Sequence, residues 1–405
     1  MRVRELAGQD IMALYRWTGV RLSAPQPRVP EAFMEVAAKY YVGLDVHKDT
    51  IAIAYAEAGS REDPRFLGTT THRVGSVTKA LSKLGAPEHF AVCHEAGPCG
   101  YGLVRELRKR GFSCVVIAPS RVARKPADRI KTDRRDALLL ARLYRAGELT
   151  AIAIPDPDDE ALRDLVRARE DAVHDQRQVR QRLRAFLLRQ GRVYERKKAW
   201  GPAHELFMSR ITFENPAHHI VFSECRMAVK TAAERVARAE EALRDQAESW
   251  RWAPVVRALM ALRGVDFIAA MTIVAEIGDL RRFPHPRELM GYIGLVPSEY
   301  SSGDTTHRGQ LTKTGNTRVR RILVEAAWNY RFPARLGESI TPRLEGLPQC
   351  IVDIGWKAQL RLCTRFRRLR ARGLHQNKTC AAIARELAGF VWDIGRQVSP
   401  ANTLH

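Results

Sequence analysis

Short apolar runs alternate with amphipathic stretches between residues 39 and 146, and this alternation constrains the fold more than any other feature of the chain. The expected strands are Tyr40–Val46, Thr50–Ala56, Phe90–Glu95 and Phe112–Ala118. The expected helices lie near residues 76–85, 103–110 and 133–146. Alternating strands and helices are typical of a sheet covered by helices. We therefore predict an α/β domain over residues 39–155.

The spacing of apolar residues changes after Pro155 and Pro157. From Leu162 to Leu187 they recur about every 3.5 residues, and a second Ala/Glu/Arg-rich stretch follows at about 217–249. This pattern predicts an antiparallel coiled-coil hairpin over residues 156–252. Two uses of the hairpin stay open: a solvated spacer or dimerisation arm, and an arm that grips nucleic acid through its many arginines.

The rest of the chain, residues 253–405, is predicted to be mainly helical. It opens with a helix, a tight turn at Gly264 and a second helix, which is the helix-hairpin-helix pattern. Such a turn can aim backbone N–H groups at a phosphate, although an ordinary helical hairpin gives the same pattern. At the other end, residues 1–38 contain three prolines and form an extension with one short helix near 8–18.

The charge of the chain indicates a polyanionic partner. It has 67 Lys and Arg against 45 Asp and Glu, for a net charge of +22. A surplus of this size is typical of nucleic-acid binding. No apolar run approaches the roughly 20 residues of a membrane span, and the first residues do not resemble a signal peptide. We therefore expect a cytoplasmic protein, with no part in the membrane.

Four carboxylates occupy positions that favour a metal site. Asp45 and Glu95 end two expected strands, while Asp133 and Asp136 begin an expected helix. The strand acids can project from one sheet face, and the i, i+3 spacing puts the other two on one helix face. Mg²⁺ prefers oxygen ligands and can act on a phosphodiester, with Lys131 beside it to neutralise phosphate charge. For Asp133 alone, capping of the helix is the alternative.

A second candidate site lies in residues 291–321, which are rich in Ser, Thr, Gly and basic side chains. Ser302 stands on a Gly-flanked segment as a possible nucleophile, and Ser301 beside it leaves a one-residue ambiguity. Nearby cations would stabilise the charge that develops on phosphorus. These nucleic-acid-binding candidates are Arg308, Lys313, Arg318, Arg320 and Arg321. The alternative is a polar surface loop leading into a helix over Thr317–Tyr330, with Asn316 as its N-cap.

Along the chain, one acid lies on each of two strands and a pair of acids follows on a helix. This order resembles the ribonuclease-H-like fold, in its Holliday-junction-resolvase (RuvC-like) branch. Sugar kinases and actin-like ATPases also begin with a strand like Gly43-Leu-Asp-Val. Those proteins need later phosphate loops of Asp-x-Gly type, and none is well placed here.

Taken together, the motifs of residues 39–395 resemble the bridge-RNA-guided DEDD transposases of insertion-sequence family one hundred and ten. The motifs are Tyr41-Val-Gly-Leu-Asp-Val-His-Lys, Glu95-Ala-Gly, Ala118-Pro-Ser, Lys131-Thr-Asp-Arg-Arg-Asp-Ala, Ala275-Glu-Ile-Gly-Asp, Tyr292-Ile-Gly-Leu-Val-Pro, Ser301-Ser-Gly, Arg308-Gly, Lys313-Thr-Gly-Asn and Ala384-Arg-Glu-Leu-Ala-Gly-Phe. Each motif is weak alone, and their order and spacing together are specific.

The resemblance implies a recombinase of prokaryotic cytosol that exchanges DNA strands. It implies that the four acids bind Mg²⁺ and that Ser302 becomes covalently joined to a DNA strand. It also implies a structured guide RNA that pairs with donor and target DNA. The family assembles as dimers to tetramers, with acids and serine supplied by different subunits.

Two rival functions stay open. One is a metal-dependent junction nuclease in which Ser302 is structural. The other is a non-catalytic protein whose charge serves only to bind nucleic acid.

Overall fold

The computed structural model describes residues 38–119, 122, 132–196, 198–302 and 305–401. These residues form two compact units, which divide between Ala161 and Leu162. The expected extension and its helix near 8–18, and also Lys131, lie outside the described residues.

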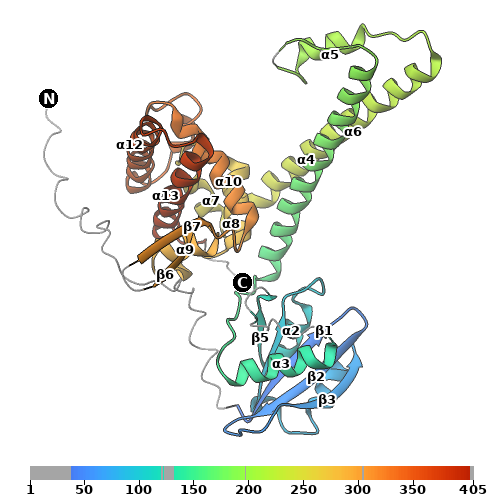
Figure 1. The fold of residues 1–405 in the computed structure, drawn as a ribbon, viewed down its shortest axis with the longest axis vertical. Coiled ribbons are helices and arrows are strands. Elements are labelled where there is room, and N and C mark those ends of the chain that lie inside the picture. The colour runs from blue at the N-terminus through green and yellow to red at the C-terminus, as the bar shows by residue number, and fades with distance from the viewer. Residues whose placement is uncertain (1–37, 120–121, 123–131, 197, 303–304, 402–405) are drawn as a thin grey trace, which may run out of the picture. The chain divides into compact units, whose positions relative to one another are not determined.

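The first unit is built on a five-stranded mixed sheet with the order β3-β2-β1-β4-β5 (Figure 1). Its strands are β1 (Tyr40–Val46), β2 (Thr50–Glu57), β3 (Arg65–Thr71), β4 (Phe90–Glu95) and β5 (Ser113–Ile117). The central strand β1 pairs antiparallel with β2 and parallel with β4, and β4 pairs parallel with β5. The α/β prediction is confirmed, but β3 was not predicted because its Thr-rich edge sequence lacks an alternating apolar pattern.

Helices cover both faces of this sheet. On one face, α1 (Val74–Leu81) and α2 (Gly102–Lys109) pack over Val42 and Leu44 of β1. On the other face, α3 (Asp133–Arg145) lies across β1 and β2 (Figure 1). The short helix η3 (Pro87–His89) precedes β4.

Gly43 allows α3 to approach the sheet closely. A Cβ atom at this position would lie 2.4 Å from the carbonyl oxygen of Ala137 and 2.5 Å from the backbone nitrogen of Ala141. The facing surface of α3 is itself small, with Ala137 and Ala141 packed against alanines of β2. The start of α3 is therefore held at a fixed height above the end of β1.

In the second unit, two long helices pair antiparallel. They are α4 (Pro157–Arg189) and α6 (Pro216–Glu248), with α5 (Pro202–Ser209) at the end of the pair where the chain turns (Figure 1). Arg169 bonds Glu240 near the base, and Arg235 bonds Asp175 at 2.7 Å further along. The sequence spacing predicted both helices and their antiparallel pairing.

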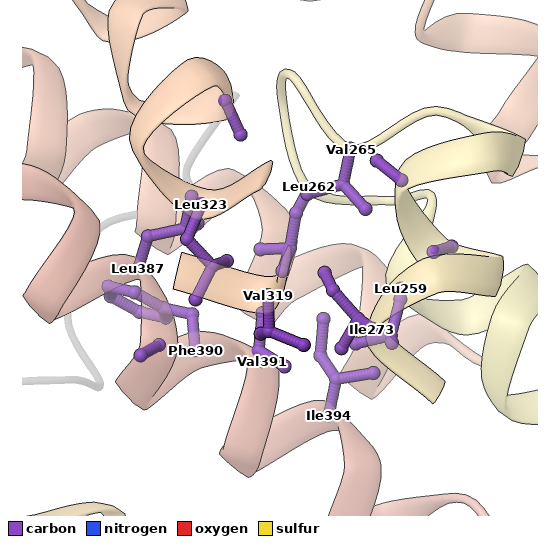
Figure 2. Close-up of a cluster of buried hydrophobic side chains, with 14 of the residues drawn as sticks. Leu259, Leu262, Val265, Ile273, Val319, Leu323, Leu387, Phe390, Val391 and Ile394 are labelled. Carbon is purple, nitrogen blue, oxygen red and sulfur yellow. The ribbon is translucent and has the colours of Figure 1, made fainter. Parts of the chain in front are cut away.

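The remainder of the second unit is mainly helical, as predicted, with one two-stranded sheet. Its elements are α7 (Ala253–Leu259), α8 (Phe267–Ile277), η5 (Leu280–Arg282), α9 (Pro286–Tyr292), β6 (Pro297–Ser302), β7 (Thr305–Leu311), α10 (Thr317–Ala327), η6 (Trp328–Arg331), α11 (Thr341–Leu344), α12 (Gln349–Ala371) and α13 (Gln376–Gln397). Aliphatic side chains from α7, α8, α10 and α13 fill its core (Figure 2). None of the helices in the described part of the chain is long and apolar enough to span a membrane.

Candidate metal site and serine hairpin

The fold brings Asp45 and Glu95 to the same edge of the sheet. Leu44 of β1 is in register with His94 of β4, and the next residue of each strand is the acid. Gly43 and Cys93, two residues earlier, both face α3. Since side chains alternate along a strand, Asp45 and Glu95 also face α3.

The first turn of α3 supplies Asp133 and Asp136 above that edge. The N-cap is Thr132, whose side chain accepts a hydrogen bond from the backbone N–H of Arg135 at 3.3 Å. The alternative that Asp133 caps the helix is therefore wrong. Both acids instead occupy the first turn, where the helix dipole favours negative charge.

Three side chains converge tightly at this place. The Nε2 of His47 lies 3.1 Å from Oδ2 of Asp45 and 3.4 Å from Oδ1 of Asp133. The ligand atoms of these three residues all lie within 4.8 Å of one another, which is close enough for one metal ion. Two carboxylates and an imidazole suit a divalent cation.

Asp45 is the electrostatic centre of the group. Burial raises the pKa of its carboxyl, and the negative charges of Asp136 and Asp133 raise it further, while His47 opposes the shift. A cation bound here would relieve the repulsion between these acids. Asp136 is thus close enough to act on Asp45, whereas Glu95 shares the sheet face but is not in the three-residue cluster.

His47 was not predicted as a site residue. The signal was available, because the sequence Asp45-Val-His47 puts the two side chains on the same side of the chain as the strand ends. This signal is weak alone, because a single histidine in a turn resembles many exposed ones.

Ser302 lies in an antiparallel hairpin rather than a loop. It is the last residue of β6, pairs with Thr305 of β7 and is exposed. The segment is exposed and polar as expected, but its prediction as a loop is wrong, because strands made of polar residues show no alternation of apolar side chains. The predicted Asn316 cap is present, and its Oδ1 accepts from the N–H of Val319 at 3.0 Å.

The candidate cations near the hairpin divide into two groups. Lys313 is exposed, with a left-handed φ of 54°, and the side chain of Arg308 lies outside the described residues. Arg320 donates to the carbonyls of Ile293 and Thr314, both at 2.9 Å, and so holds the loop before α10. Arg318 and Arg321 bind Glu170 of α4, at 2.6 and 2.9 Å.

Glu276 is the buried centre of this ionic network, and the sequence did not reveal it. Arg167 donates to its carboxylate twice, at 2.7 and 3.0 Å, and Asn316 donates at 2.7 Å. Burial raises the pKa of Glu276, but the hydrogen bonds from Arg167 and Asn316 and the charges of Arg167 and Arg163 lower it overall. The network joins α4, α8 and the N-terminus of α10.

Comparison with known proteins identifies the family of the chain. Residues 42–190 match the DEDD transposase family model of the IS110 group, and residues 256–336 match the family described as Transposase IS116/IS110/IS902. A putative transposase (y4qE) of Sinorhizobium fredii is 48% identical over 88% of both chains. The transposase of insertion sequence element IS1533 from Leptospira borgpetersenii is 33% identical over 82% of this chain and 96% of its own.

The two family models and these relatives define the class as a transposase. The chain belongs to the IS110 family of DEDD transposases.

Proposed function

We propose that this transposase exchanges DNA strands through a covalent phosphoserine intermediate, in a reaction that depends on Mg²⁺ and is guided by a structured RNA. The observation that carries the proposal is the convergence of Asp45, His47 and Asp133 at the sheet edge. The ribonuclease-H-like fold, with Glu95 and Asp136 as further metal ligands, is part of the same proposal.

The donor set fits a divalent ion. Asp45 is half-buried and Asp133 is exposed, with 18% and 56% of their side chains accessible, so the cluster opens to solvent on one side. A divalent ion held there would neutralise phosphate oxygens and favour attack on phosphorus. The chain's own acids position that charge, and the rigid contact of α3 with β1 fixes their separation.

The covalent step belongs to Ser302. Its Oγ gives up a proton and forms a bond to phosphorus, while the bond from phosphorus to the leaving deoxyribose oxygen breaks and that oxygen takes up a proton. The phosphodiester energy is retained in the phosphoserine, so rejoining to a second strand needs no external energy source. An exposed hairpin end suits this role, because the nucleophile must reach a DNA backbone.

The experiment incubates the purified protein with Mg²⁺, donor and target DNA and the RNA encoded beside the gene. We expect a protein–DNA adduct that survives denaturation and is absent from Ser302→Ala but present in Ser301→Ala. An adduct retained in Ser302→Ala would contradict the covalent role, and strand cleavage without any adduct would favour the junction-nuclease alternative. Recombination without RNA would contradict the guidance.

Mixing two inactive variants tests whether the acids and the serine act from different subunits. If they do, Asp45→Asn and Ser302→Ala proteins restore strand exchange when combined, because one supplies the serine and the other the acids. Mixed proteins that stay as inactive as either alone would contradict the arrangement. Light scattering on the same samples gives the oligomeric state.

A further inference from the structure

Five large apolar side chains are exposed together on the helical part of the second unit. They are Trp328, Phe332, Leu336, Trp356 and Leu360, with 36%, 47%, 54%, 38% and 48% of their surfaces accessible. Single exposed apolar residues are ordinary, but a group that includes three aromatic rings indicates a partner. We call this group the aromatic patch.

Backbone contacts place the two halves of the patch against each other. The segment after η6 lies on α12, since the N–H of Arg335 donates to Oε1 of the buried Gln359 at 3.3 Å. Gln359 sits between Trp356 and Leu360 in the sequence, and those two residues are one turn apart on the helix. This hydrogen bond holds the segment that contains Phe332 and Leu336 against α12, the helix that carries Trp356 and Leu360.

Arginines are interleaved with the rings. The guanidinium of Arg331 lies 4.9 Å from the ring centre of Trp328 and 4.2 Å from that of Phe332. Arg263 lies 6.0 Å from the ring of Phe332 and donates to the carbonyl of Pro333 at 2.8 Å. This alternation of cation and aromatic ring combines charge for phosphates with flat faces for bases.

The surroundings of the patch are basic. Residues 326–337 contain two arginines and no acid. Helix α12 carries six Lys and Arg and a single acid, Asp353, which accepts a hydrogen bond from Gln349 at 2.8 Å. A second copy of the same face would bring the same positive charge, which opposes self-association through the patch.

We propose that the aromatic patch binds an unpaired stretch of DNA, with bases stacked on its rings and phosphates on its arginines. Bases in a duplex hide their faces in the stack, so only an unpaired strand can use such a surface. Transfer of a strand from one duplex to another requires that the strand leave its partner. The patch includes none of the acids and does not include Ser302, so the inference does not depend on the covalent mechanism.

The test measures binding of fluorescent oligo-thymidine, oligo-uridine and a DNA duplex by anisotropy. In the double variant Phe332→Leu, Trp356→Leu the surface stays apolar but loses its flat rings. We expect oligo-thymidine to bind about tenfold or more weakly, since each base stacked on a ring contributes substantially, with duplex binding unchanged. The double variant Phe332→Tyr, Trp356→Phe keeps the rings and should bind like the parent protein.

Leu206→Ala removes an equally exposed apolar side chain from α5, outside the patch, and serves as the matched control. Unchanged oligo-thymidine binding in the leucine variant would overturn the proposal, as would an equal loss for the duplex. A loss confined to oligo-uridine would assign the patch to RNA instead. A change in molecular mass by light scattering, in the leucine variant or in Trp356→Ala, would assign it to a protein interface.

Discussion

The proposed metal site and the serine hairpin are built in opposite ways. Asp45 is half-buried on the central strand of a sheet, and Gly43 beside it lets α3 approach to a distance that no larger residue allows. Ser302 is exposed at the end of a two-stranded sheet that carries no core of its own. A metal site needs ligands held in place, whereas a nucleophile that must reach a DNA backbone needs access. The five predictions below test this contrast and the contacts behind it, in order of expected effect.

The largest effect is expected from the central acid. Asp45→Asn should lower the rate of DNA cleavage about a thousandfold or more, because a metal held by this acid would lower the activation barrier by several kcal/mol and each 1.4 kcal/mol is tenfold. Asp49→Asn, an exposed acid in the turn after the same strand, is the control and should cleave normally. The rates of DNA cleavage by both variants and by the parent protein are measured in excess Mg²⁺. A normal rate for Asp45→Asn would show that a metal held by this acid is not needed for cleavage.

The contrast in rigidity is tested with two glycines. The Cβ of Gly43→Ala would meet backbone atoms of α3 at 2.4 Å, whereas that of Gly309→Ala would meet the Oγ of Ser298 at 2.3 Å, which can rotate away. Gly43→Ala should therefore cost about 3 kcal/mol and Gly309→Ala much less. Hydrogen exchange at β1 and α3, and at β6 and β7, measures the two costs. Equal costs would mean that the hairpin is as rigidly packed as the sheet.

Substitution of Glu276 tests whether the ionic network of α4, α8 and α10 is structural. Glu276→Ala leaves Arg167 and Asn316 without their acceptor and should lower the free energy of unfolding by about 3 kcal/mol. Glu276→Gln, which keeps one acceptor oxygen, should cost less. Metal affinity at Asp45 should not change, and a loss of metal binding would show that the network serves the metal site.

The same residue gives a pH dependence. The pKa of Glu276 in the folded protein is below its ordinary value of 4.5, so its contribution to stability is complete above that pH and is lost as the pH falls through the lower value. Urea unfolding at a series of acidic pH values should show a smaller slope in Glu276→Gln than in the parent protein.

His47 is expected to have the smallest effect. An imidazole favours transition metals over Mg²⁺, so His47→Ala should weaken Mn²⁺ binding by about tenfold and Mg²⁺ binding less. Calorimetric titration with each ion makes the comparison. Equal weakening for both ions would mean that the ring only orients Asp45 and Asp133. The control for the turn is His72→Ala, because the ring of His72 contacts the carbonyl of His47.

The sequence predicted those helices and strands whose apolar residues recur with a regular spacing inside the element. The strands before Asp45 and Glu95, the helix that begins at Asp133 and the two long helices all carry their pattern within one element, and the family resemblance confirmed by the relatives follows from the same motifs. The cap at Asn316 was predictable for the same reason, since a cap depends only on its neighbours.

What the sequence did not predict depends on contacts between distant or polar residues. Arg167 and Glu276 are 109 residues apart, and nothing in either neighbourhood indicates the other. The strand β3 and the hairpin of β6 and β7 have polar sequences, which pattern analysis assigns to loops. The predicted helix over Thr317–Tyr330 instead changes to a tighter turn at Trp328, where Arg331 packs on the Trp328 ring.

The pairing of α4 with α6 has a mechanical consequence. A helix of 33 residues is about 50 Å long at 1.5 Å per residue, and the ionic network around Glu276 and Glu170 grips α4 close to its base. A small tilt of such a long helix therefore gives a large displacement at its end: a tilt of about 5° at the base moves the far end by about 4 Å. Conversely, a force applied at the far end acts on the arginine–glutamate contacts at the base, and these contacts also hold the start of α10.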